Sequence, residues 1–230
     1  MPLRPKPDAM PRKIVGAAFI SLDGVIQAPG GPGEDDQGDF PYGGWLEPVA
    51  DEAVGEQIDG LFDGPFDLLL GRRTYDIFAS YWPFQPMDGP IAALFAKVEK
   101  FVLTRSDAPL EWVGSHRLAD IDALAALKQQ DGPDLVIQGS STLYPQLFQR
   151  GLIDKLVLML APVAVGQGKR LFGEGTPAGT FKLVEQRVGS KGNVVLTYEP
   201  AGKLETGTFA TQEVSERELE RREKVKAGTW

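Results

Sequence analysis

The sequence predicts an α/β domain whose central sheet is mixed but mainly parallel and ends in a C-terminal antiparallel hairpin. Short apolar runs typical of buried strands alternate with amphipathic stretches through most of the 230 residues. Near the C-terminus, two apolar runs are joined by the turn-forming residues 190–193, which is typical of a hairpin. Helical crossovers cover both faces of parallel sheets, so the strands are expected to be buried.

The strands are recognised by continuous apolar or β-branched runs that stop at Gly or polar residues. They are expected at 13–22, 66–70, 100–103, 135–137, 155–164, 181–188 and 194–198. The helices are recognised by apolar residues at helical spacing, and one of them starts after Ser140, Ser141 and Thr142 and stops at Gly151. They are expected at 47–62, 74–79, 90–98, 120–129 and from residue 143 onward.

Three segments are expected outside the regular elements. Residues 1–11 contain four prolines and are expected to form a flexible leader before a domain that spans residues 12–210. Residues 27–44 are rich in Gly, Pro and Asp, and a loop of this length is usually functional or disordered. Residues 211–230 are expected to form a charged helical tail, with five acidic and five basic residues between 213 and 226.

Composition excludes several classes of protein. The chain has no Cys, which excludes disulfides, thiolate metal sites and thiol catalysis, and fits a cytoplasmic location. The formal net charge of −8 argues against a nucleic-acid binder. No apolar run approaches the roughly 20 residues of a membrane helix. His116 is the only histidine and is expected to be structural, so no metal site is predicted.

The charge is distributed unevenly along the chain. No Lys or Arg occurs between Ile14 and Gly71, whereas twelve Asp and Glu residues do. One interpretation is a solvated acidic face. The other is that later segments hold any anionic ligand, while this part meets something neutral or cationic.

Anion-binding residues follow three of the predicted strands. They are Gly71-Arg72-Arg73-Thr74, Thr104-Arg105-Ser106 and Gly139-Ser140-Ser141-Thr142. Arginine matches phosphate with paired hydrogen bonds, and a glycine-hydroxyl turn that opens a helix presents free N–H groups. Because ligands of open α/β sheets bind at the carboxyl ends of parallel strands, three such motifs predict a ligand with several phosphates, such as a dinucleotide.

The ordered motifs resemble the dihydrofolate reductase superfamily, and within it the C-terminal reductase domain of riboflavin biosynthesis and its stand-alone homologues. The resemblance covers about residues 12–200. It is carried by the three strand-end motifs together with Ser21-Leu22-Asp23-Gly24, Gly139-x-x-x-Leu143, Leu152-Ile153-Asp154-Lys155, Ala161-Pro162 and Gly166-x-Gly168-x-x-Leu171-Phe172. It implies a three-layer dihydrofolate-reductase-like fold, NADPH as cofactor, hydride transfer and a homodimer.

The resemblance also implies roles for individual residues. Gly71, Arg72 and Thr74 would meet the dinucleotide phosphates. Thr104, Arg105 and Ser106 would hold the adenosine ribose and its 2′-phosphate. The pyrophosphate would lie on Gly139, Ser140, Ser141, Thr142 and Leu143, and the nicotinamide on Ala17, Ala18 and Ile26. Two basic strand ends favour NADP over NAD.

Ser140 departs from the family pattern, which has a second glycine at this position. A serine Cβ is expected to crowd an approaching pyrophosphate unless the backbone φ there is negative. The sequence therefore marks this residue as the point where cofactor binding is most exposed to test.

Reduction of a C=N bond also needs a proton donor, and two carboxylates are candidates. Asp51, on the helix after the long loop, is expected to be the acid, with a pKa raised by partial burial. The alternative is that it only favours the start of the helix. Asp23 is the second candidate, although an Asp-Gly pair is most often a turn.

The expected reaction is NADPH-dependent reduction of a small pterin- or pyrimidine-like heterocycle bound between the 27–44 loop and the 47–62 helix. Two alternatives remain. One is the 5-amino-6-(5-phosphoribosylamino)uracil reductase of riboflavin biosynthesis, disfavoured because Val25 stands where that reductase commonly has a basic residue. The other is a non-catalytic nucleotide-binding protein.

Overall fold

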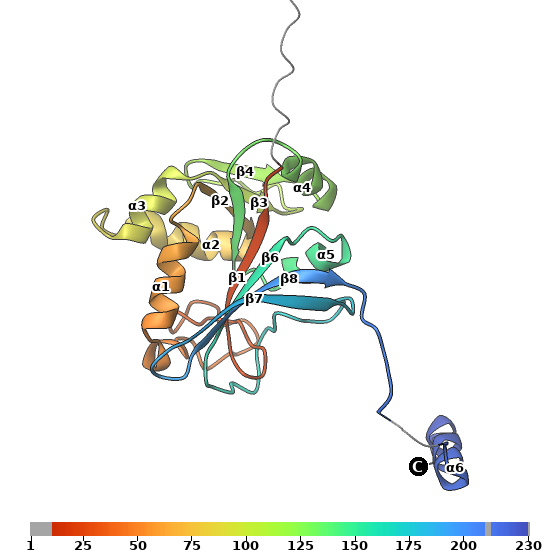
Figure 1. Ribbon diagram of the computed structural model, residues 1–230. Helices are drawn as coiled ribbons and strands as arrows, with labels where there is room; N and C mark the ends of the chain where they lie inside the picture. The colour runs from red at the N-terminus through yellow and green to blue at the C-terminus, as the bar shows by residue number, and fades with distance from the viewer. Residues whose placement is uncertain (1–10, 210–212, 230) are drawn as a thin grey trace, which may run out of the picture.

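The molecule is built around one eight-stranded sheet. A computed structural model describes residues 11–209 and 213–229, so residues 1–10 of the expected leader and residues 210–212 and 230 near the tail lie outside the described part. The strands lie in the order β4-β3-β2-β5-β1-β6-β8-β7 (Figure 1). They are β1 (Ile14–Ile20), β2 (Phe66–Gly71), β3 (Lys100–Leu103), β4 (Ser115–Leu118), β5 (Asp134–Gln138), β6 (Lys155–Leu160), β7 (Thr180–Val188) and β8 (Val194–Gly202).

The predicted mixed sheet is confirmed. The strands from β4 through to β6 pair in parallel, with Ala17 of β1 opposite Gln138 of β5 and Gly71 of β2 opposite Leu103 of β3. The last two strands, β8 and β7, are antiparallel and form the expected hairpin.

Helices cover both faces of this sheet, which gives the predicted three layers. Alternation along β1 assigns the faces: Ala17 shares a buried cluster with Val54, and Ala18 shares another with Leu124 and Tyr144. The helices on the first face are α1 (Glu52–Leu61), α2 (Arg72–Tyr81) and α3 (Pro90–Lys97). Those on the second face are α4 (Ile121–Lys128) and α5 (Leu143–Gln149) (Figure 1).

Gly16 shows how closely the second layer approaches the sheet. A Cβ at this position would lie 2.7 Å from Cε1 of Tyr144, which is fully buried. Only glycine leaves room for that ring between β1 and α5. The close contact fixes α5, and the turn in front of it, against the strand that carries Ala17 and Ala18.

Several element boundaries differ from the prediction. The helix expected at 47–62 is a short 3-10 turn, η1 (Glu47–Val49), followed by α1, because Ala50 and Asp51 have extended backbones between them. The strand expected at 155–164 ends at Leu160, shortly before Pro162, which has no N–H to donate to a sheet. The helix expected at 74–79 is longer, since α2 begins at Arg72 and ends at Tyr81. A second 3-10 turn, η2 (Trp82–Phe84), follows it.

Strand β4 was not predicted. Its sequence, Ser-His-Arg-Leu, has only one large apolar residue, and it pairs as an edge strand with β3 alone. His116, on this strand, contacts Glu99 and stacks on Phe101. Within the described residues, no group of three or more His, Cys, Asp or Glu is arranged to hold a metal ion.

The tail contains helix α6 (Glu216–Lys226), and Ser215 caps it by accepting a hydrogen bond from the N–H of Glu218. None of its residues is buried. Across residues 11–209 and 213–229, the helices are too short or too polar to cross a lipid bilayer.

Candidate functional site

The three anion-binding motifs come together at the carboxyl ends of neighbouring strands in the sheet. They follow β3, β2 and β5, which are adjacent and parallel, so their carboxyl ends point the same way. The side chain of Ser140, after β5, accepts a hydrogen bond of 2.8 Å from the N–H of Gly71, the last residue of β2. The guanidinium of Arg72 donates to the carbonyl of Ala108, just beyond the motif that follows β3.

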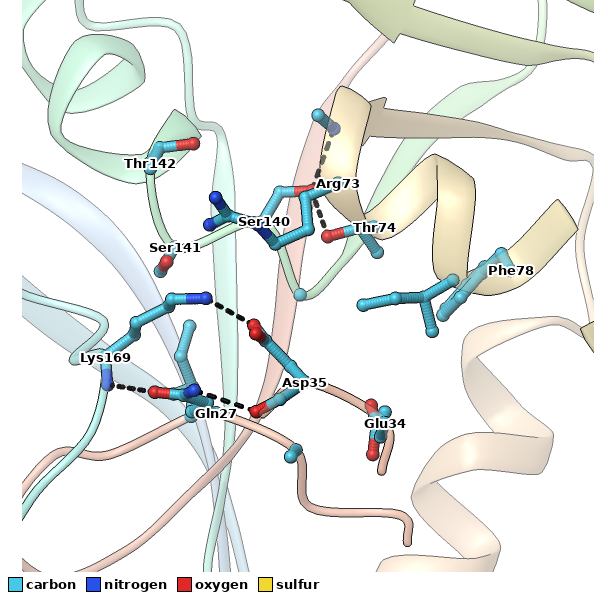
Figure 2. A pocket seen from close by; sticks show the side chains of 15 residues that line it. Gln27, Glu34, Asp35, Arg73, Thr74, Phe78, Ser140, Ser141, Thr142 and Lys169 are labelled. Atoms are coloured by element: carbon cyan, nitrogen blue, oxygen red, sulfur yellow. Dashed lines mark hydrogen bonds and ion pairs between the residues drawn. The ribbon is translucent and has the colours of Figure 1, made fainter. Parts of the chain in front are cut away.

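A cavity of about 790 Å³ lies beside these strand ends. Strand β5 stops at Gln138, but β1 continues to Ile20, so Ala18 and Phe19 face an open gap on the β5 side. The connection after β1 leads over one face of the sheet to β2, and the connection after β5 leads over the other face to β6. A smaller cavity of about 70 Å³ shares Ile26 and Gly139 with the large one and reaches the strand-end motifs (Figure 2).

The large cavity is bounded by the 27–44 loop on one side and by α2 and η2, not by the 47–62 helix, on the other. Residues 29–34 face α2 and η2 across the large cavity, through Ile77, Phe78 and Trp82. Helix α1 does not line either cavity, because its apolar side is buried against β1, β6 and β8. The place of the substrate between the loop and the 47–62 helix stays a prediction, and the cavity beside the loop is walled by α2 and η2 instead.

Most of the residues expected to hold the cofactor line these cavities. Ala17 and Ala18 line the large cavity, and Ile26 and Gly139 line both. The small cavity is also lined by Gly71, Thr74, Ser140, Ser141 and Thr142. Leu143 does not line it, since this side chain is buried in the core under α5. Thr104, Arg105 and Ser106 lie at the neighbouring strand end, outside both cavities.

The arginine that lines the small cavity is Arg73, not Arg72. Arg72 is held away by an ion pair of 2.9 Å with Asp76 and by its position over the ring of Tyr75. Arg73 lines the cavity beside Ser140 and Ser141 (Figure 2), and no partner among the described residues binds its guanidinium. The sequence did offer this residue, in the Gly-Arg-Arg-Thr motif, but did not show which arginine α2 would turn towards the cavity.

Ser140 has a backbone φ of +65°, so the negative φ that would relieve crowding does not occur. Its hydroxyl donates to Oγ1 of Thr74 at 2.8 Å and accepts from the N–H of Gly71. The serine side chain therefore points at the start of α2 and links two of the three motifs. It occupies polar groups that a glycine would leave to a ligand.

We expect Ser140→Gly to bind NADPH several-fold more tightly than the wild type while its stability changes little. The substitution relieves a left-handed backbone, worth about 1–2 kcal/mol, and loses two hydrogen bonds of about 1 kcal/mol each. It also frees the Gly71 N–H and the Thr74 hydroxyl. Titration of NADPH and thermal unfolding check this, with Ser141→Gly as a control on the same turn. Weaker binding would show that the hydroxyl bridge shapes the site.

Asp51 does not have the environment that was predicted for a catalytic acid. It lies at the start of α1 and accepts a hydrogen bond of 3.0 Å from the N–H of Lys191, in the β7–β8 turn. Desolvation is the largest influence on its pKa and raises it, but hydrogen bonding to Asn193, Lys191 and Val54 outweighs it and lowers the pKa. The predicted raised pKa is wrong. The structure places Asp51 where it ties the hairpin to α1, outside both cavities.

Asp23 also has a structural setting. Its two carboxylate oxygens accept hydrogen bonds from the N–H groups of Val165 and Gly166, at 2.9 and 2.8 Å. The hydroxyl of Ser21 donates to the same carboxylate and, with these N–H groups, holds its pKa far below the usual range. Asp23 lines neither cavity. The turn interpretation of Asp23-Gly24 therefore fits better than the catalytic one.

Glu34 is a carboxylate that lines both cavities, and the sequence offered it only as one of twelve acidic residues. Burial raises its pKa, against hydrogen bonds from the N–H groups of Gly30 and Gly31 and with a further contribution from the charge of Asp35. A single half-buried carboxylate in a Gly-rich loop has no periodic signal, so only its position in three dimensions distinguishes it.

Charge is divided between the two cavities. Among the described residues, the large cavity is lined by Glu34 and Asp76 and by no Lys or Arg. The small cavity includes the cations Arg73 and Lys169, of which Lys169 is paired with Asp35 (Figure 2). A ligand that spans both would meet a free guanidinium at one end and an apolar, acidic chamber at the other.

The fold and this cavity define a dihydrofolate-reductase-like α/β protein. The sequence of residues 12–195 matches the RibD C-terminal domain family, and the chain belongs to this family.

Individual relatives agree with this assignment. YyaP of Bacillus subtilis (strain 168), a protein of uncharacterized function, is 26% identical over 199 residues, which cover 81% of this chain and 94% of YyaP. A crystal structure of a protein assigned to riboflavin biosynthesis from Shewanella sp. PV-4 is similar with a TM-score of 0.62, at 23% identity, over 82% of this chain and 99% of that one. Dihydrofolate reductase from Enterococcus faecalis, complexed with NADP(H), has a TM-score of 0.52 at 18% identity, over 82% and 96%. At such identities the two structures support the fold.

Proposed function

We propose that this protein is an NADPH-dependent reductase of a small pterin- or pyrimidine-like heterocycle. The observation that carries the proposal is the pair of joined cavities. The small one gathers residues of two strand-end motifs around an unpaired guanidinium, and the large one opens beside Ala17 and Ala18 on β1. The family and its fold relatives, which include reductases, support an oxidoreductase.

The residues present fit NADPH. Arg73 and Thr74 lie in the first turn of α2, whose N-terminus has no side-chain cap, so its first N–H groups add to the attraction for phosphate. Arg105 is exposed at the adjacent strand end, where it would hold the 2′-phosphate. Gly139, with φ of +81°, adds no side chain between the cavities. When bound, NADPH supplies a hydride, and Ala17, Ala18 and Ile26 would hold the nicotinamide against β1.

The large cavity favours a neutral or cationic substrate. Its lining residues include two carboxylates, apolar side chains and the aromatic rings of Phe78, Tyr81 and Trp82, which suit a flat heterocycle. A phosphoribosyl substrate, as in the riboflavin pathway, would need a cation here, and the lining provides none. The cations in the adjoining small cavity are Arg73 and Lys169. The phosphates of NADPH would compete with the phosphate of such a substrate for Arg73.

The test is NADPH oxidation by the purified protein with dihydropterin, dihydrofolate and the phosphoribosylaminopyrimidine as separate substrates. We expect turnover with a pterin, faster with NADPH than with NADH, and little with the phosphorylated substrate. Turnover with the phosphorylated substrate alone would favour the riboflavin-pathway reductase. NADPH binding without oxidation of any substrate would contradict the proposed reaction and favour a non-catalytic nucleotide-binding protein.

A further inference from the structure

Glu34 lines both cavities but has no proposed role in the binding of phosphate or nicotinamide. We propose that Glu34 is the catalytic acid, whose carboxyl group gives a proton to the nitrogen of the C=N bond that is reduced. This inference rests on the proposed reductase function and deepens it, because it assigns the proton donor and the chemical class of substrate.

Glu34 lies where an acid for this reaction would be needed. It lines both the small polar cavity, whose residues Figure 2 shows, and the large one. Ile26 and Gly139 also line both cavities. Ala17 and Ala18, where the nicotinamide is proposed, line the same large cavity as Glu34. A heterocycle in this cavity would therefore share one chamber with both the nicotinamide and the carboxyl group of Glu34.

Only one carboxylate oxygen of Glu34, Oε2, accepts hydrogen bonds from the described residues. Oε2 accepts from the N–H of Gly30 at 2.7 Å and from the N–H of Gly31 at 3.2 Å. Oε1 receives no hydrogen bond from residues 11–209 or 213–229. The two glycine N–H groups therefore orient the carboxyl group through one oxygen and leave the other to carry a proton or to meet a substrate N–H.

The surrounding charges favour the protonated form. Lys169, which lines the small cavity with Glu34, is paired with Asp35 (Figure 2). From the opposite wall, Asp76 of α2 faces the same cavity and is paired with Arg72. Arg73 faces the small cavity, where it would pair with bound phosphate. Glu34 thus has carboxylates near it and no cation of its own, and burial raises its pKa.

The loop that carries Glu34 is held in place by the rest of the fold. Gln27 is buried, donates to the carbonyls of Asp35 and Gln37, and accepts from the N–H of Lys169. The indole N–H of Trp45 donates to the carbonyl of Gln27 at 2.8 Å. A carboxyl group on such a loop has a fixed position, as an acid catalyst requires.

The proton transfer balances with the hydride. The O–H bond of Glu34 breaks and an N–H bond forms on the heterocycle, while the hydride from NADPH forms the C–H bond. The C=N bond is reduced, NADPH is oxidised to NADP⁺, and Glu34 is left as a carboxylate that regains its proton from solvent. The preferred substrate is therefore a neutral cyclic imine, because a nitrogen that already carries a proton would not need the acid.

The kinetic test compares Glu34→Gln with Asp36→Asn, using NADPH and dihydropterin. The glutamine keeps an oxygen that accepts the two glycine N–H groups but removes the acid. We expect kcat to fall by about 100- to 10,000-fold in Glu34→Gln, with NADPH affinity unchanged. Asp36 is an exposed neighbour in the same loop and lines neither cavity, so Asp36→Asn is expected to keep the wild-type kcat.

A second measurement does not depend on turnover. In the protein without cofactor, carboxyl carbon-13 signals of labelled glutamate are followed by NMR as pH is raised. We expect one signal to titrate above the usual range for glutamate and to be missing from Glu34→Gln. Because the acid must be protonated, wild-type kcat/KM, which reports the pKa of the free enzyme, is expected to fall as pH rises through that same pKa.

The outcomes separate the two proposals. If Glu34→Gln keeps kcat within about twofold of the wild type, or if no glutamate titrates above the usual range, Glu34 is not the acid and the reductase proposal stands. If the wild type does not bind NADPH, the reductase proposal fails and the role of Glu34 fails with it. If Glu34→Gln does not fold, the wild-type NMR titration and pH profile decide.

Discussion

Arg73→Gln is expected to weaken NADPH binding by about 10- to 100-fold, with little change in stability. A hydrogen bond to a charged group contributes about 1.5–3 kcal/mol, and Arg73 is the guanidinium that lines the small cavity without a partner among the described residues. Its guanidinium binds no partner within residues 11–209 and 213–229, so its loss is expected to remove affinity alone. Titration of NADPH into the variant measures the effect. The affinity should also fall steeply with salt in the wild type and less steeply in the variant.

Arg72→Gln provides the comparison, because the family resemblance assigned the phosphates to this residue. Arg72 is bound to Asp76 and to the carbonyl of Ala108, so we expect its loss to loosen the start of α2 and to change NADPH affinity less than Arg73→Gln does. The reverse order of effects would mean that the two side chains exchange positions when the cofactor binds.

Gly168→Ala is expected to destabilise the protein by about 2–4 kcal/mol and to lower Tm by roughly 5–15 °C. Gly168 has φ of +122°, and an added Cβ would lie 2.8 Å from the ring of Phe40 and 2.9 Å from Val25. Phe40 and Val25 belong to the small buried cluster under the 27–44 loop. The clash therefore acts on the loop that carries Glu34, and we expect turnover to fall along with Tm.

Gly166→Ala is the matched control. Gly166 also has a positive φ, of +88°, but a Cβ there would have no neighbour within 4 Å. Gly166→Ala is therefore expected to lose only about 1–2 kcal/mol of stability through backbone strain and to keep the loop intact. Equal losses of Tm and turnover in both variants would show that backbone strain, and not contact with the loop, explains the effect.

The sheet could be predicted because its signals are local. Continuous apolar runs and the polar residues after them indicate where β2, β3 and β5 end, and their adjacency follows from the resemblance. The polar edge strand β4 has no such signal. The break at Ala50 and Asp51 depends on how η1 and α1 pack, which periodicity does not encode.

The site was predicted in part, because the backbone positions of the motifs follow from the strands whereas side-chain directions do not. Arg72 and Arg73 are adjacent in sequence, and only the geometry of α2 decides which one faces the cavity. Asp51 and Asp23 were chosen by residue type and place in the chain, and each accepts backbone N–H groups from a segment more than 100 residues away. Glu34 was overlooked because nothing in the sequence shows that its side chain, and not that of Asp35 or Asp36, lines the large cavity.

The most direct test of the central claim is energy transfer from tryptophan to NADPH. Trp82 lines the large cavity, so bound reduced nicotinamide would lie within transfer range of its indole. The account predicts saturable quenching of tryptophan emission, a matching rise in NADPH emission, weaker binding of NADH, and less transfer in Trp82→Phe at unchanged affinity. Absence of quenching and transfer at protein and NADPH concentrations that saturate related reductases would contradict it.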